Sequence, residues 1–159
     1  MKKDSFALRL KVVAVIAAVM CIALFFVVFP LLGSTISANY PEFAYAFWPC
    51  LIYLWVMSVP IFIALWEFYK ISREIGLDNS FSVENSVSLD RISKLAIIDT
   101  VLLFIGVIVM MALSLLPVSV FVAAIIIAIL GVVLSVVCAA LSHLVLKAKK
   151  LKDENDLTI

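Results

Sequence analysis

The most constraining feature of this chain is the position of its basic residues. All 12 Lys and Arg residues lie in three short segments, Met1–Lys11, Tyr69–Lys94 and Lys147–Ile159, and long apolar runs separate these segments. A soluble protein distributes basic residues over its whole surface, whereas a protein that crosses the bilayer several times concentrates them in its cytoplasmic segments. The pattern therefore predicts a polytopic membrane protein with three cytoplasmic segments.

The composition agrees with a lipid environment. Hydrophobic residues make up 66% of the 159 residues and charged residues only 14%, far outside the range of soluble globular domains. A helix needs roughly 20 apolar residues to cross the hydrocarbon core, and four stretches are long enough: Val12–Leu32, Tyr45–Phe68, Leu95–Leu115 and Val118–Leu146. The fourth is longer than a span requires, so we expect it either to tilt or to continue beyond the membrane.

These spans predict an all-α fold, an integral membrane four-helix bundle that forms one domain over residues 1–159. Both termini, the loop 69–94 and the tail 147–159 would be cytoplasmic, and the loop would join two helical hairpins. The first apolar run is longer than the roughly 7–15 residues of a signal-peptide core. We therefore expect it to remain as an uncleaved membrane helix.

The sequence carries no signature of an enzyme or a cofactor protein. It contains no phosphate-binding Gly-rich loop, no HExxH, no CxxC and no dinucleotide fingerprint. Cys21, Cys50 and Cys138 all lie within the spans, without the spacing of a metal site or a redox pair, and are expected to be packing residues. We expect no enzymatic activity, no cofactor, no metal and no direct binding of nucleic acid.

Small residues form a stripe along the fourth span. Their steps of three and four residues are typical of a helix that packs closely on another, and the stripe consists of Ala124, Ala128, Gly131, Ser135, Cys138 and Ser142. The third span offers a matching series at Ala96, Asp99, Leu103, Gly106, Met110 and Leu113. The two series predict packing within one monomer, and the alternative is a homo-oligomer formed through the fourth span.

Three ionisable residues, Glu67, Asp99 and His143, lie within the predicted spans, each near the basic boundary of its own span. Asp99 and His143 extend the two facing stripes, so the sequence predicts that they can meet. One interpretation is a cluster that responds to protons or cations, with Asp99 as its deepest member. The other is an interfacial network that reaches the headgroups and the neighbouring basic residues.

The cytoplasmic loop contains helix signals. Gly76 is a usual residue at the end of a helix, and Ser82 is a favourable N-cap with Glu84 in the first turn. The new helix would run through Leu89 and Ile92 into the third span. It would serve either as a docking site or as an element that only orients that span.

The tail ends in an acidic and then apolar sequence. An extended end of this kind suits capture by a groove or a sheet edge of a partner, and the alternative is a frayed terminus. The residues concerned are Asp156, Leu157, Thr158 and Ile159.

The loop and the tail resemble one known family. The pattern Gly76, Phe81-Ser82-x-Glu84-Asn85, Leu89 and Ile92, and the ending Leu151-x-x-Glu154-Asn155-Asp156-Leu157-Thr158-Ile159, are similar to the YoaS-like family of small bacterial four-span membrane proteins. That family is a domain of unknown function. The resemblance implies a protein of the bacterial plasma membrane, is compatible with a helix-turn-helix regulator as a cytosolic partner, and implies no activity.

Two functional hypotheses follow. The first is a non-enzymatic regulator or scaffold that binds a cytosolic partner through the loop residues Ser82, Glu84, Asn85, Leu89 and Ile92 and through the tail residues 156–159. The second is a small transporter or channel, necessarily oligomeric, that uses Glu67, Asp99 and His143. An intramembrane enzyme is disfavoured, because the chain has a single His and no paired nucleophile and base.

Overall fold

The computed structural model describes residues 2–77 and 79–156, and every regular element within them is helical. In chain order these are α1 (Lys2–Ala23), the π-helix η1 (Leu24–Val28), α2 (Phe29–Asn39), the 3-10 helix η2 (Pro41–Ala46), α3 (Phe47–Gly76), α4 (Val83–Ala112) and α5 (Val118–Asp156). Four segments are long and apolar enough to cross a membrane: Ala7–Asn39, Pro41–Gly76, Val83–Ala112 and Val118–Asn155. The predicted all-α fold with four potential membrane spans is confirmed.

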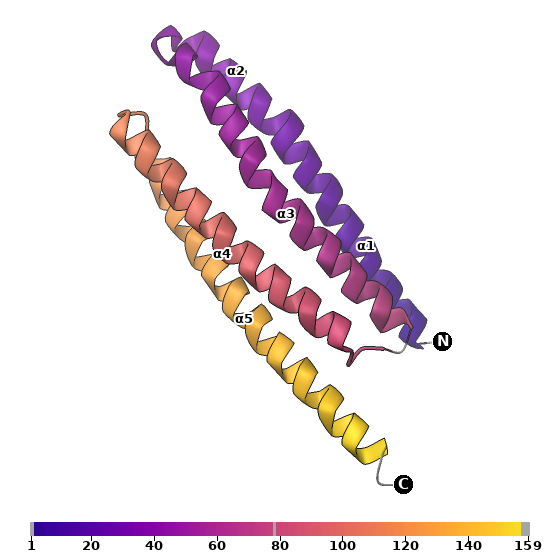
Figure 1. Ribbon diagram of the computed structural model, residues 1–159. Helices are drawn as coiled ribbons and strands as arrows, with labels where there is room; N and C mark the ends of the chain where they lie inside the picture. The colour runs from indigo at the N-terminus through magenta and orange to yellow at the C-terminus, as the bar shows by residue number, and fades with distance from the viewer. Residues whose placement is uncertain (1, 78, 157–159) are drawn as a thin grey trace.

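The long helices lie in a row rather than in a closed bundle (Figure 1). α3 packs against α1 and α4, and α5 packs against α4. Within the described residues, no Cα atom of α1 lies within 8 Å of a Cα atom of α4 or α5. The row arises because the residues that permit close approach on α4 lie on two different faces, one for α3 and one for α5.

The two ends of the row differ in charge (Figure 1). The start of α1, the connection between α3 and α4, and the end of α5 lie together at one end. We call it the basic end, because the three segments that contain all Lys and Arg residues meet there. The opposite end, which we call the turn end, carries η2 and the turn Leu113–Pro117 between α4 and α5.

The first span contains a π-helical turn, and its cause is Pro30. Proline has no backbone N–H, so Pro30 cannot donate a hydrogen bond to the carbonyl of Phe26. In η1 the N–H of Phe29 bonds to the carbonyl of Leu24, one residue further back than in an α-helix. The widened turn absorbs the proline, and the helix continues to Asn39, beyond the predicted end of this span.

Trp55 of α3 joins this π-helical turn to the neighbouring helix. Its indole N–H donates to the carbonyl of Phe25 over 3.2 Å, and its ring stacks on Phe26 with the centroids 5.8 Å apart. Tryptophan is well suited to this position, because its ring packs among apolar groups while its N–H donates a hydrogen bond to a backbone carbonyl. The acyl chains of the lipid cannot supply such a hydrogen bond. The proline and the tryptophan together fix α1 against α3.

The small-residue stripe of α5 packs against α4, as predicted for a single monomer. The Ser142 hydroxyl donates to the carbonyl of Ser86 over 2.7 Å, and the hydroxyls of Ser93 and Ser135 are 3.0 Å apart. Because α4 covers the stripe, the stripe is not available for a homodimer in this conformation. The buried members are Ala124, Ala128, Ser135 and Cys138.

The predicted partner series on α4 is confirmed at Ala96 and wrong at Gly106. Ala96 does lie beside Gly131 of α5, but Gly106 lies against the ring of Tyr53 on α3. The true partners of α5 recur every seven residues along α4, at Ser86, Ser93 and Thr100. Ser86 and Ser93 were not predicted because they precede residue 95, where the predicted span began, whereas α4 begins at Val83.

The turn between α4 and α5 contains a strained residue. Ser114 has a φ of 57°, and it is the only non-glycine residue with positive φ among residues 2–77 and 79–156. Its N–H bonds to the carbonyl of Met111, and the N–H of Leu115 bonds to the carbonyl of Met110. This is the Schellman arrangement, in which glycine usually occupies the position of Ser114 because it has no Cβ.

Replacement of Ser114 by glycine is therefore expected to stabilise the protein. The removed strain is about 1–2 kcal/mol, and the greater freedom of glycine in the unfolded chain offsets about half of it, so the net gain is about 0.5–1 kcal/mol. Thermal unfolding in detergent micelles measures the effect. Ser34→Gly in α2 is the control, because there the same change should destabilise by about 0.5 kcal/mol. Equal effects of the two substitutions on thermal stability would contradict the conclusion that the backbone of Ser114 is strained.

Close approach at Gly131 gives a second prediction. A Cβ atom at residue 131 would collide with the Thr100 hydroxyl, whereas the Thr100 Cβ would remain at 3.7 Å. Gly131→Ala is expected to lower the free energy of unfolding by about 1–3 kcal/mol. Thr100→Ala in the same chain removes the colliding oxygen and should restore most of the loss. A double variant no more stable than Gly131→Ala, measured by the same thermal unfolding, would exclude this contact as the cause.

Candidate functional site

A hydrogen-bonded connection joins α3 to α4 at the basic end. α3 ends at Gly76, as predicted, and the predicted N-cap is confirmed, because the Ser82 hydroxyl accepts the N–H of Asn85 over 3.1 Å. The Asn85 amide in turn donates to the carbonyls of Asn79 and Ser80 at 3.1 and 3.0 Å. These bonds satisfy backbone groups of the connection and fix the start of α4.

Most loop residues predicted to bind a partner are instead used by the fold. Ser82, Asn85 and Ile92 are buried, Leu89 is half-buried, and Glu84 is exposed. We therefore correct the prediction that these five residues form one docking surface. α4 continues without interruption from the cap into the span, which is the alternative of an element that orients the span. Glu84 is the member of the set that stays accessible.

α5 continues as a single helix beyond the predicted end of the fourth span, to Asp156. Of the four residues predicted to form an extended end, Asp156 is the last residue of this helix. Leu157, Thr158 and Ile159 lie outside the described residues.

Glu67 of α3 is the centre of the polar contact with α4. It is only 4% exposed, and its carboxylate accepts hydrogen bonds from Ser88 Oγ at 2.7 Å, Lys70 Nζ at 2.9 Å and Arg91 Nη1 at 3.2 Å. A carboxylate in a membrane span is costly unless it has partners. Here two of the three donors come from α4, so Glu67 both meets this requirement and joins the two helices.

Asp99 and His143 do not meet, and this prediction is wrong. His143 is exposed and follows Ser142, which pairs with Ser86 of α4. Asp99 lies thirteen positions beyond Ser86, about 20 Å along the helix. Its buried Oδ1 atom has no hydrogen-bond partner among the described residues.

Glu67 is also separate from Asp99. Its contact on α4 at Arg91 lies eight positions before Asp99, about 12 Å along the helix. The three ionisable residues therefore occupy three places, not one cluster. The prediction placed Asp99 on the face of α4 that contacts α5. That face is instead occupied by the hydroxyl groups that recur every seven residues along α4.

A cleft of about 590 Å³ opens at the turn end, between the α2–α3 side and the turn that joins α4 to α5. Most of its lining is apolar or aromatic, and the polar exceptions include Ser37, Tyr40 and Ser114. The volume is within the range of small-molecule sites, and the lining suits an acyl chain or another apolar molecule. Sequence analysis did not find this cleft, although the aromatic residues around η2 were a signal for it.

The fold and these contacts define a class: a polytopic α-helical membrane protein whose helices are joined by small residues, hydroxyl groups and one buried carboxylate. Residues 31–159 match the family model described as "Protein of unknown function (DUF2975)". The chain belongs to this family.

One relative supports the assignment over nearly the whole chain. The protein is 26% identical over 152 residues to "Uncharacterized membrane protein YoaS" of Bacillus subtilis (strain 168), which covers 94% of this chain and 95% of that protein. The resemblance to the YoaS-like family is confirmed. No solved structure matches the chain.

The Glu67 contact gives a third prediction. Glu67→Ala leaves Ser88 without its acceptor and separates α3 from α4, so we expect the free energy of unfolding to fall by about 2–3 kcal/mol. Asp90→Ala is the control, because it breaks a partly exposed pair with Lys94, with side chains 46% and 70% accessible, and such pairs contribute about 0.5 kcal/mol or less. Unfolding by denaturant in micelles measures both variants. An effect of Glu67→Ala as small as that of the control would exclude the proposed role.

Proposed function

We propose that this protein is a non-enzymatic membrane scaffold or regulator that presents the extension of α5 to a cytosolic partner. One observation supports this above the others: α5 is a single helix of 39 residues, about 58 Å long at 1.5 Å per residue. The hydrocarbon core is about 30 Å thick, and a helix tilted by about 40° crosses it in about 39 Å. A substantial part of α5 therefore projects from the membrane at the basic end.

The charges of this extension change sign along the helix. Its first part carries Lys147, Lys149, Lys150 and Lys152, and acidic residues follow from Asp153. Lys149 and Asp153 form an ion pair of 2.6 Å one turn apart, and residues 151–155 are exposed. In the proposed arrangement the basic part lies at the anionic headgroups, and the acidic part stands free of the membrane where a protein can bind it.

The proposal places the basic end in the cytosol of a bacterium, with the protein in the plasma membrane and both termini cytoplasmic. The concentration of Lys and Arg at this end supports the orientation, and the relative from Bacillus subtilis supports the bacterial membrane. The partner we infer is a cytosolic regulatory protein, for which a helix-turn-helix regulator is one suitable class.

The transporter or channel hypothesis receives less support from the geometry. A path for ions or protons needs polar groups in succession across the membrane. The Glu67 carboxylate accepts hydrogen bonds from three donors at the basic end, and His143 is exposed on α5. Asp99 lies about 12 Å further along α4 than Arg91. The groups are therefore not arranged in such a succession within one chain.

Truncation of the extension tests the proposed function. Removal of residues 153–159 deletes the acidic part but leaves the contacts of α5 with α4, so the membrane domain should remain folded. We expect cross-linking in intact membranes, followed by mass spectrometry, to recover a cytosolic partner with the full chain and to lose it with the truncated chain. Glu84→Lys changes an exposed acidic residue elsewhere at the basic end and serves as the control. Recovery of the same partner with the truncated chain would contradict the proposal.

A further inference from the structure

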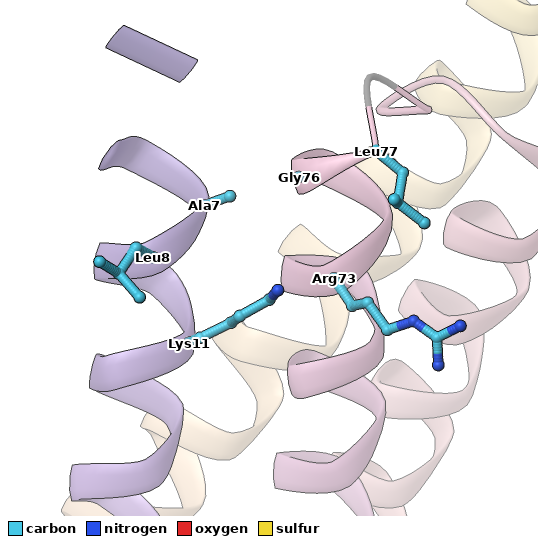
Figure 2. Close-up of a pocket in the computed structure, with 6 residues that line it drawn as sticks. All are labelled: Ala7, Leu8, Lys11, Arg73, Gly76 and Leu77. Atoms are coloured by element: carbon cyan, nitrogen blue, oxygen red, sulfur yellow. The ribbon is translucent and has the colours of Figure 1, made fainter. Parts of the chain in front are cut away.

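A second cleft lies at the basic end, between α1 and α3 (Figure 2). Its volume is about 330 Å³, and it is lined by Ala7, Leu8, Lys11, Arg73, Gly76 and Leu77. α1 and α3 are close together at the cleft: a Cβ atom at residue 76 would lie 3.2 Å from the Cβ of Ala7 and 3.9 Å from the Nζ of Lys11. Glycine and alanine at this contact keep space open for the lysine side chain.

Two cationic side chains, those of Lys11 and Arg73, line the cleft. Lys11 is half-buried, and its side chain crosses from α1 towards α3 (Figure 2). Among the side chains that the structure describes, those of residues 7–77 and 79–155, none forms a hydrogen bond or an ion pair with Lys11 or Arg73. None of the described lining residues carries a carboxylate, and the carboxylate of the nearby Glu74 accepts a hydrogen bond from Asn79.

The other basic residues of α3 and α4 differ in this respect. Lys70 and Arg91 pair with Glu67, and Lys94 pairs with Asp90. Arg73 alone among them has no acidic partner within the part of the chain that the structure describes. The half-buried Lys11 ammonium has lost part of its hydration, and an anion from outside the chain would compensate this loss.

We propose that this cleft binds the phosphate of an anionic phospholipid headgroup, with Lys11 and Arg73 as its cationic ligands. The site lies at the level where the apolar spans meet the basic segments, which is the level of the headgroups. Leu8 and Leu77 line its opening and are 62% and 64% exposed, so apolar surface is available for the adjacent acyl chains. A soluble anion would gain nothing from these two leucines.

The two cations have different roles in this site. The Lys11 ammonium points into the gap between the helices, whereas the Arg73 guanidinium extends from α3 on the side of Leu77 (Figure 2). Arg73 is exposed, and exposed side chains change rotamer within nanoseconds. In the proposed site a change of rotamer turns the Arg73 guanidinium, whose fork of N–H donors matches phosphate oxygens, towards the phosphate held by Lys11.

Lipid binding to the purified full chain tests this inference. Native mass spectrometry in detergent, with added phosphatidylglycerol or phosphatidylcholine, gives the apparent affinity for each lipid. Each basic residue near a headgroup contributes about five-fold to the affinity for an anionic lipid. The double variant Lys11→Gln/Arg73→Gln should therefore bind phosphatidylglycerol about 20- to 30-fold more weakly, with phosphatidylcholine unchanged. The charge-preserving variant Lys11→Arg/Arg73→Lys should keep most of the preference and shows that the substituted positions permit folding.

The matched control removes the same charge outside the cleft. Arg9→Gln/Lys94→Gln should bind phosphatidylglycerol within about two-fold of the unchanged protein, because neither residue lines the cleft. Equal losses in the two neutralised variants would show general attraction to the basic end and would overturn the site. Displacement of the lipid by millimolar inorganic phosphate would assign the site to a soluble anion and would overturn the lipid. The outcome does not depend on the partner of the α5 extension, so the two proposals can fail separately.

Discussion

Helices in lipid receive no hydrophobic stabilisation from each other, because the acyl chains are as apolar as their own side chains. Association must come from close packing and from hydrogen bonds, and the contacts of this protein follow that constraint. α4 and α5 meet through Gly131 and two pairs of serines. α1 and α3 meet through a small-residue contact at one end and a tryptophan hydrogen bond in the middle.

The same constraint explains why polar residues occur where a simple hydropathy profile would not place them. Glu67 is buried because three donors surround it, and the carbonyl of Phe25 in the π-helical turn is satisfied by an indole. In each case a group that lipid cannot solvate becomes a specific link between two helices. Polarity in these spans therefore determines which helices are neighbours.

Sequence analysis predicted the features that depend on composition and on local signals. The four spans, the cap at Ser82, the end of α3 at Gly76 and the packing stripe of α5 all follow from residue type and spacing. The features that depend on rotation of one helix about its axis were not predictable in this way. Asp99 and Gly106 fit a stripe of regular spacing, but α4 has two such stripes and these residues belong to the one that faces α3. The burial of Asn85 and Ile92 was not predicted either. A cytoplasmic loop was expected at these positions, whereas α4 has already begun at Val83.

The linear order of the helices has a mechanical consequence. The α1–α3 pair and the α4–α5 pair are attached to each other chiefly where α3 touches α4, with the Glu67 contact at one extremity and the apolar cleft at the other. The two helix pairs can therefore rotate relative to each other about the Glu67 contact, and the two turns at the turn end can move apart. A molecule that wedges between the two turns would rotate α5 about the Glu67 contact, and the α5 extension on the opposite side of that contact would move in the opposite direction.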